Sequence, residues 1–278
     1  MTAQDHATGI AATATAPAPA PATPATAPTP ATSTPAPDRF DPTSLTRFVT
    51  IHYYKTQFTG WSRSSYVLLA VGIAVQLAIG LSAGVTGLAL TSTLAGIIGF
   101  TCTVAITNGK PINGLLGFIS AALFGYVALV TGNYSDIVMQ VAYIAMLDLP
   151  IIFGMWRTFE PKTMKRRDYA TTALLFVGFF AALFAMDTLL LHSPQAFLDA
   201  FSATIGLVGA VLCVRQFRAQ YYFWTFQGIM SVALWIQTAI NGHAVWVLMF
   251  TYVLYLANDL IAFVDSKWFK NKDAAPLG

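Results

Sequence analysis

The sequence predicts an all-α polytopic membrane protein with eight transmembrane helices, in which an N-terminal helix precedes a 3+1+3 parallel repeat. Three observations support this fold: the composition, the spacing of the apolar runs and the distribution of the basic residues. The chain is 56% hydrophobic and 10% charged, with a mean hydropathy of +0.61. A soluble domain carries about 25% charged residues, so this composition is typical of a chain that lies mostly in lipid.

The chain begins with a polar region that contains almost no large apolar residue. The stretch "APAPAPATPATAPTPATSTPAP" is built of alanine, proline and threonine, which cannot bury a core. We therefore expect residues 1–42 to form a disordered cytoplasmic tail. Residues 1–9 show neither a basic run nor a following apolar stretch, so the sequence does not predict a signal peptide.

Eight apolar runs follow, each near the ~20 residues that an α-helix needs to cross ~30 Å of hydrocarbon. Residues 43–85 are expected to contain a membrane approach and an extra N-terminal helix. The predicted spans are 66–84, 86–106, 112–131, 134–157, 169–191, 196–214, 221–240 and 244–264.

The basic residues indicate how the spans are oriented. With eight spans, all 15 Lys and Arg residues fall on one side of the membrane, in the N-terminal region, three connections and the C-terminal tail. Because positively charged loops stay in the cytoplasm, both termini are expected there, in a multi-pass protein of the plasma membrane. Seven spans would break this partition, which is the main argument for the eighth.

A weak internal repeat relates the second to fourth spans to the sixth to eighth. An offset of 111 residues (204 − 93) aligns Thr93 with Thr204, and it also aligns two cysteines, two serines and two aspartates. Three spans, one linking span and three more give both triplets the same orientation, as in the parallel repeats of SWEET transporters. The predicted core is 86–268, with repeat 1 at 86–157, a linker helix at 169–191 and repeat 2 at 196–268. A second cytoplasmic tail is expected at 269–278.

The seventh span carries polar residues where lipid offers no partner. Within "QYYFWTFQGIMSVALW", Trp224, Gln227, Ser231 and Trp235 share one helical face. Indole rings can stack on a flat ring compound, and the amide and hydroxyl can bind its polar edge. A cationic ring would gain a further ~0.5–2 kcal/mol from the indoles. Close packing is the favoured interpretation of Gly228 on this face.

Other intramembrane polar residues extend the candidate site. Asp148 and Asp259 lie past the midplane, where a carboxylate is costly; a helix–helix hydrogen bond and a role in the transport path both stay open. Asp187 is near a span end and is expected to reach the interface. The predicted substrate-binding residues are Trp224, Gln227, Ser231, Trp235, Asn258, Asp259, Tyr255, Asp148, Ser120, Asn113 and Gln140.

No motif for catalysis, a metal ion or a cofactor is present in the sequence. It contains no phosphate-cradling glycine loop, no His/Cys cluster with metal-ligand spacing and no nucleophile elbow. The two cysteines lie in apolar runs and are expected to be buried and unpaired. We therefore expect no enzyme, no cofactor and no nucleic-acid partner.

The stretches "NGKPINGLLGFISAALFGYVALV", "FWTFQGIMSVALWI" and "YVLYLANDLIAFVDSKW" resemble the PnuC family of nicotinamide riboside transporters, over about residues 90–268. The resemblance implies a three-plus-one-plus-three helix arrangement and a homotrimer. It also implies facilitated diffusion of nicotinamide riboside, made one-way by a cytoplasmic kinase that phosphorylates the nucleoside for NAD biosynthesis.

Two positions depart from the family pattern. Gly228 stands where the family usually has Asn, and Met146, Leu147 and Asp148 stand where it often has Pro-Met-Gln. A related cargo therefore stays open, such as thiamine, riboflavin or a deoxynucleoside, as does proton coupling through Asp148 or Asp259. A non-transporting scaffold or a membrane enzyme is the alternative from another class.

Overall fold

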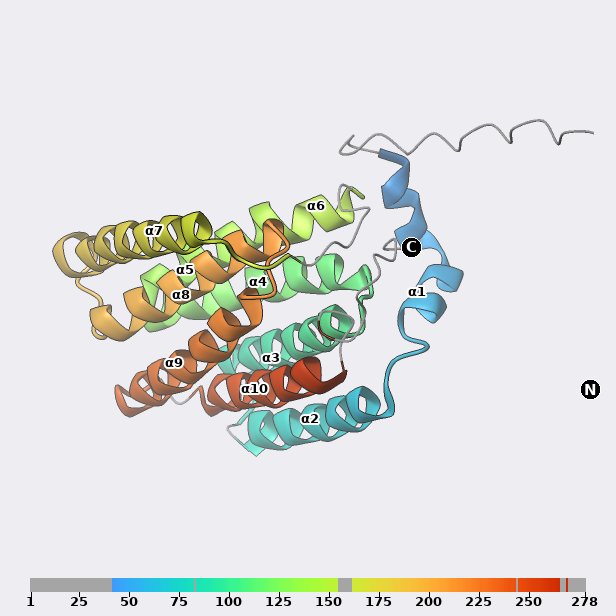
Figure 1. The fold of residues 1–278 in the computed structure, drawn as a ribbon. Coiled ribbons are helices and arrows are strands. Elements are labelled where there is room, and N and C mark those ends of the chain that lie inside the picture. Colours follow the sequence, from blue (N-terminus) through green and yellow to red (C-terminus); the bar gives the residue numbers. More distant parts are fainter. Residues whose placement is uncertain (1–41, 83, 155–161, 244, 266–268, 270–278) are drawn as a thin grey trace, which may run out of the picture. The chain divides into compact units, whose positions relative to one another are not determined.

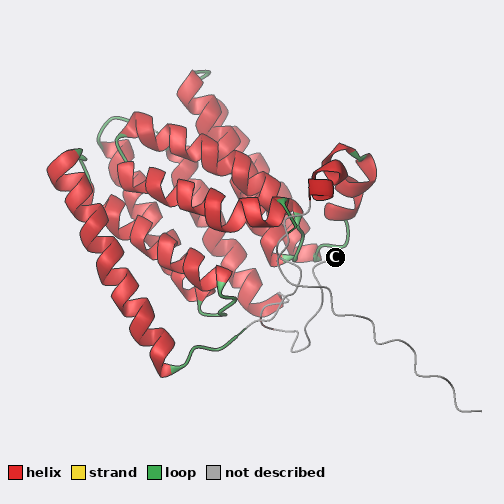
Figure 2. Cartoon of the chain, turned by 90° about the horizontal axis from the view of Figure 1, so that it is seen from above, coloured by secondary structure: helices red, strands yellow, loops and turns green. Residues whose placement is uncertain are grey.

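The computed structural model describes residues 42–82, 84–154, 162–243, 245–265 and 269. The chain divides into two units, Met1–Ala36 and Pro37–Gly278, and all of the described residues belong to the second. The predicted tails, 1–42 and 269–278, lie outside the described residues except at their inner ends. Every regular element of the described part is a helix (Figures 1 and 2).

The helices follow the predicted spans closely. They are η1 (Pro42–Val49), α1 (Ile51–Gln57), α2 (Arg63–Ser82), α3 (Gly87–Thr107), α4 (Ile112–Thr131), α5 (Tyr134–Tyr143), η2 (Ile144–Asp148), α6 (Leu149–Ile152), α7 (Arg166–Ala185), η3 (Met186–Leu190), α8 (Ala196–Val214), α9 (Gln220–Ile240) and α10 (Trp246–Asp265). The elements α5, η2 and α6 form one continuous rod, and so do α7 and η3.

Seven of the eight predicted spans are long and apolar enough to cross a membrane. The eighth, α9, has 21 residues and no charged side chain, but it carries Gln220, Gln227 and Gln237. Because of these amides and its tyrosines and tryptophans, its most apolar stretch is less apolar than those of the other seven long helices. The eight-span count therefore stays a prediction at α9, where the candidate site residues are concentrated.

Six helical rods pack in a closed ring. Going round it, α3 packs on α4, α4 on α5, α5 on α8, α8 on α9, α9 on α10, and α10 returns to α3. The helix α2 lies outside this ring against α3 and α10, and α7 lies outside it against α8. The ring therefore contains the two triplets expected of a repeat, while the extra N-terminal helix and the linker helix are peripheral (Figure 1).

A π-helical turn, η2, interrupts the rod that carries Asp148. Pro150 follows this turn. Proline has no N–H to donate, and its ring clashes with the carbonyl four residues earlier, which a wider turn relieves. The turn ends on Asp148 and aims this side chain at α4.

Side-chain amides join three connections at the end of the bundle that is opposite the basic loops. Gln195, before α8, donates to Asn133, before α5, and to Thr238 Oγ1 of α9 at 2.8 Å. Asn241 Nδ2 donates back to Gln195 Oε1 at 2.7 Å. Gln195 is only 7% exposed, and Asn133 and Thr238 are fully buried, so these bonds close this end of the bundle.

The segment η1–α1 crosses the other end of the bundle (Figure 1). Gln57 Oε1 accepts from the Ile112 amide at 3.2 Å, and Arg47 Nη2 donates to the Ile151 carbonyl at 2.8 Å. Trp61 donates its indole N–H to the Gln57 carbonyl at 2.7 Å and is 6% exposed. The approach to the membrane is therefore anchored on α4 and on the C-terminus of α6.

We expect Gln195→Leu to destabilise the protein, because the buried Asn133 Oδ1 then loses its described donor and the buried Thr238 Oγ1 loses one of its two. Such a loss costs about 1–3 kcal/mol per group. The thermal unfolding midpoint in detergent measures the effect. Gln237→Leu is the matched control, since Gln237 bonds Asn241 in an exposed setting, and it should shift the midpoint little. Equal midpoints for the two variants would contradict the role of this network.

Candidate functional site

The polar face of α9 points into the ring and is buried there. Gln227 Nε2 donates to Ser231 Oγ at 3.1 Å and approaches Met139 Sδ of α5 at 3.9 Å. Ser231 Oγ lies 2.7 Å from Ser202 Oγ of α8, and Tyr252 of α10 lies beside it. Ser231 thus joins α8 and α9 next to α10, and Gln227 extends the polar surface toward α5.

Trp235 lies one helical turn beyond Ser231 and is completely buried. Its indole packs in a cluster with Phe124 of α4 and Tyr252 and Leu248 of α10. The Nε1–H of Trp235 has no hydrogen-bond partner among the described residues. A buried donor without a partner costs free energy, so this N–H is a candidate contact for a bound ligand.

Tyr255 and Ser120 approach the same point of α3 from opposite sides. Both hydroxyls lie where a side chain at Gly99 would stand. Ser120 Oγ donates to the Ala95 carbonyl at 3.0 Å, and Tyr255 lies near Thr103. Tyr255 also contacts Tyr252 edge-on, with ring centroids 5.2 Å apart. This contact links the Gly99 position to the Trp235 cluster.

The carboxylate of Asp148 lies against Gly117 of α4, where any side chain would displace it. Asp148 is 6% exposed, and its Oδ2 has no hydrogen-bond partner among the described residues. Cys102 of α3 and Cys213 of α8 both lie within range of its charge. Asp148 therefore faces the inside of the ring, between the first helices of the two triplets.

Five predicted site residues lie apart from this group. Trp224 packs against Gly209 and Tyr221, and Asp259 accepts from Thr225 at 3.0 Å. Asn258 donates to Thr107 at 2.8 Å, and its Oδ1 has no described partner. Asn113 donates to the carbonyl of Lys110, the preceding connection, at 2.8 Å. Gln140 donates to Asp136 at 3.4 Å.

Sequence reasoning missed several residues that line the same interior. Met139 and Tyr143 meet above Gly206 of α8, which leaves room for the Met139 sulfur and the Tyr143 hydroxyl. Tyr252 lies beside Ser231 and packs in the cluster of Trp235. The spacing of these residues was a usable signal. Met139 and Tyr143 are four residues apart, and Tyr252 and Tyr255 are three apart, so each pair shares one helical face.

The expectation that Asp187 reaches the interface is wrong. Asp187 is completely buried and accepts from Ser135 Oγ at 2.7 Å. Asp199, which is also completely buried, accepts from the Ser135 and Asp136 amides at 2.9 and 3.0 Å. The Asp199 carboxylate satisfies two free N–H groups at the start of α5, a need that every helix N-terminus has, and Asp187 holds the Ser135 hydroxyl beside them. The acidic residues in the first turns of α5 and α8 were the signal that could have indicated this cap.

The interior group has the chemistry of a small-molecule site. It combines an indole donor, an amide, hydroxyls and tyrosine rings within a helical ring, which suits a flat polar compound. Among the described residues no group of three or more His, Cys, Asp or Glu is placed to hold a metal ion. The fold and this interior together define a polytopic membrane protein with a candidate binding site inside its helical ring.

Comparison with known proteins identifies the family. The sequence model of the family described as "Nicotinamide mononucleotide transporter" matches residues 89–270, which is more than half of the chain. The chain belongs to this family of transporters. It is therefore a multi-pass membrane transporter of a small molecule.

Two relatives and one solved structure are similar to this chain. A nicotinamide riboside transporter PnuC from Neisseria mucosa is 24% identical over 81% of this chain and 88% of its own length. One from Haemophilus influenzae is 25% identical over 76% and 92%. The crystal structure of the vitamin B3 transporter PnuC has a TM-score of 0.68 at 21% identity, and the match covers 80% of this chain and 97% of that one. That structure supports the fold.

The contact between Asp148 and Gly117 predicts a large effect for a small substitution. Gly117→Ala should displace the carboxylate and destabilise the protein by about 1–3 kcal/mol, as overpacking does in other proteins. Gly125→Ala on the same helix is the matched control, because nothing lies within 4 Å of the added atom. Thermal unfolding in detergent compares the two.

A second-site variant tests the same contact. Asp148→Gly should remove most of the cost of Gly117→Ala, which gives a coupling energy between the two positions. Additive effects of the two substitutions would show that the contact does not exist.

Proposed function

We propose that this protein carries nicotinamide riboside across the plasma membrane by facilitated diffusion, and that cytoplasmic phosphorylation makes uptake one-way. The observation that carries this proposal is the family match over residues 89–270. Both similar relatives bear the name nicotinamide riboside transporter. A cytoplasmic nucleoside kinase would then be a functional partner, because a charged phosphate keeps the product from returning.

The proposed binding site is the interior group around α9. Trp235, with its buried N–H, would face the nicotinamide ring or the ribose, while Gln227 and Ser231 would bind polar groups of the nucleoside. Asp148 supports a cationic cargo, since its carboxylate is buried without a basic partner among the described residues. The pyridinium ring of nicotinamide riboside is such a cation.

The proposed topology has eight spans with both termini in the cytoplasm, in a homotrimer. The closed ring of two triplets, with α2 and α7 outside it, supports a 3+1+3 parallel repeat with one extra N-terminal helix. The helix boundaries also keep the register of the repeat, since α3 and α8, and α4 and α9, begin at matching positions to within three residues under the 111-residue offset.

A related cargo is the second candidate within transport. Gly228 packs against Leu256 of α10 and offers no amide where the family usually has Asn. Thiamine, riboflavin or a deoxynucleoside would then compete with nicotinamide riboside. Binding of these compounds and their phosphates to the purified protein distinguishes the candidates.

We expect Gln227→Leu to weaken nicotinamide riboside binding about 5- to 150-fold, because a polar group of the ligand would lose its partner at a cost of about 1–3 kcal/mol. Trp235→Phe should also weaken binding, since it removes the indole N–H but keeps an aromatic ring. Isothermal titration of the purified variants measures both effects.

The controls make the same substitutions away from the interior. Gln237→Leu lies on the same helix in an exposed setting, and Trp246→Phe replaces a tryptophan that is 42% exposed. Both should bind like the parent protein. If Gln227→Leu and Trp235→Phe fold and bind with unchanged affinity, α9 does not form the binding site.

Facilitated diffusion predicts uptake into vesicles that persists after proton and sodium gradients are collapsed, and that stops at equal concentrations on both sides. Radiolabelled nicotinamide riboside in proteoliposomes measures this. Accumulation that needs a proton gradient and is lost in Asp148→Asn would instead support the proton-coupled alternative.

A further inference from the structure

A groove separate from the proposed substrate site lies between α7 and α9, at the end of the bundle that carries the basic loops. It has a volume of about 780 Å³. Its walls come from the start of α7, from the connection before it, and from the turn that leads into α9. None of the predicted substrate-binding residues lines it. The lining residues used below are Lys162, Tyr169, Ala173, Phe176, Arg218 and Tyr222.

The rim of the groove that carries Lys162 and Arg218 is basic, and backbone hydrogen bonds hold it in place. The Lys162 amide donates to the Gln216 carbonyl at 2.7 Å, and the Arg218 amide donates to the Lys162 carbonyl at 3.1 Å. This short bridge joins the connection before α7 to the turn before α9. The bridge uses only the backbone of Lys162 and Arg218, and both residues line the groove.

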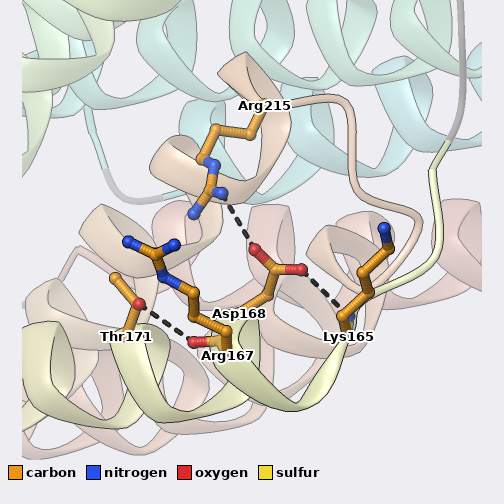
Figure 3. A network of polar contacts seen from close by, with 5 residues as sticks. All are labelled: Lys165, Arg167, Asp168, Thr171 and Arg215. Atoms are coloured by element: carbon orange, nitrogen blue, oxygen red, sulfur yellow. Dashed lines mark hydrogen bonds and ion pairs between the residues drawn. The ribbon is translucent and has the colours of Figure 1, made fainter.

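The positive charge at this rim is not balanced within the described residues. The segments 162–168 and 215–218 carry six Lys and Arg residues and a single carboxylate, Asp168. Asp168 binds Arg215 at 2.9 Å and the Lys165 amide at 2.9 Å (Figure 3), so both of its oxygens are occupied. Arg218 Nε is buried and has no hydrogen-bond partner among the described residues.

The floor of the groove is apolar and continues onto the surface that faces lipid. Phe176 belongs to a buried cluster with Val208, Leu212 and Phe217, whereas Val177 and Tyr222 on the same walls are 64% and 63% exposed. Only 11% of the most apolar window of α7 is buried, the smallest share among the seven candidate spans. Because α7 is peripheral to the ring, the groove opens sideways toward the acyl chains.

We propose that this groove binds an acidic phospholipid, with its phosphate at Lys162 and Arg218 and one acyl chain along Phe176 and Val177. Basic pockets between transmembrane helices at the membrane surface bind anionic headgroups in this way. The rim supplies the charge, the floor supplies the apolar track, and both lie at the level where headgroup meets hydrocarbon. A neutral or zwitterionic lipid would leave the charge of the rim uncompensated.

The test titrates the purified full-length protein in detergent with phosphatidylglycerol or with phosphatidylcholine of the same acyl chains, and follows bound lipid by native mass spectrometry. Phosphatidylglycerol should bind more tightly. The double variant Lys162→Gln/Arg218→Gln should weaken its binding roughly 30-fold, at about fivefold for each basic side chain near an anionic headgroup. Ala173→Trp, which fills the groove without changing the charge, should also weaken it.

The matched control is Lys55→Gln/Arg63→Gln, which removes the same charge from exposed positions outside the groove; it should bind phosphatidylglycerol like the parent protein. Equal affinity of the parent for both lipids, or equal loss in the control, would overturn the proposal. Glycerol phosphate that competes as well as the whole lipid would indicate a site for a free phosphate and overturn the lipid assignment. Loss of self-association in Ala173→Trp, with lipid binding unchanged, would assign the groove to a second copy of the chain instead.

Discussion

The absence of water inside the bilayer is the constraint on which this structure depends. A polar side chain in a span must find its partner within the protein, because lipid offers none. The helices therefore pack against one another at positions where polar side chains of both helices can hydrogen-bond. Ser231 joins α8 to α9, and Gln195 joins three connections. The closed ring of six rods brings these hydrogen-bonding side chains into contact.

Glycine residues leave the space that these contacts between helices need. Gly96 leaves room for Gln76 and Thr251, which bond each other at 2.9 Å across α2 and α10. Gly99, Gly117 and Gly206 leave comparable room for side chains of the neighbouring helices. Small residues allow close approach of helices in lipid, where no hydrophobic effect drives helices together. Here polar atoms of neighbouring helices occupy the space beside these glycines. The same positions therefore allow both close helix packing and polar contacts between helices.

The polar groups are separated by level along the bundle. The amide network around Gln195 and the carboxylate cap of α5 lie at one end, and the amides of the network all have described partners within the protein. The interior group around Gln227 and Trp235 lies deeper, and it keeps a donor without a partner. The basic connections lie at the opposite end and leave positive charge unbalanced. A ligand contact is therefore more strongly indicated in the interior and at the basic end than in the amide network.

The sequence by itself located the long helical rods to within about one helical turn, because helix length and apolar composition are local properties read directly from the residues. It also indicated the polar face of α9, since residues three and four apart share a helical face. The same reasoning placed Trp224 with Trp235, and Asp259 with Asn258, in one site. Only the tertiary structure decided which neighbour each polar residue meets.

Which neighbour each polar residue contacts depends on how the rods are rotated and ordered around the ring. Asp187 illustrates the reason. Its distance from a span end indicated contact with the interface, yet it is completely buried against the start of α5. The cap that it helps to form uses residues from three separate rods. Tyr143 and Tyr252 each share a helical face with another residue of the interior, which their spacing indicates, but only the packing of the rods decides which helix that face meets.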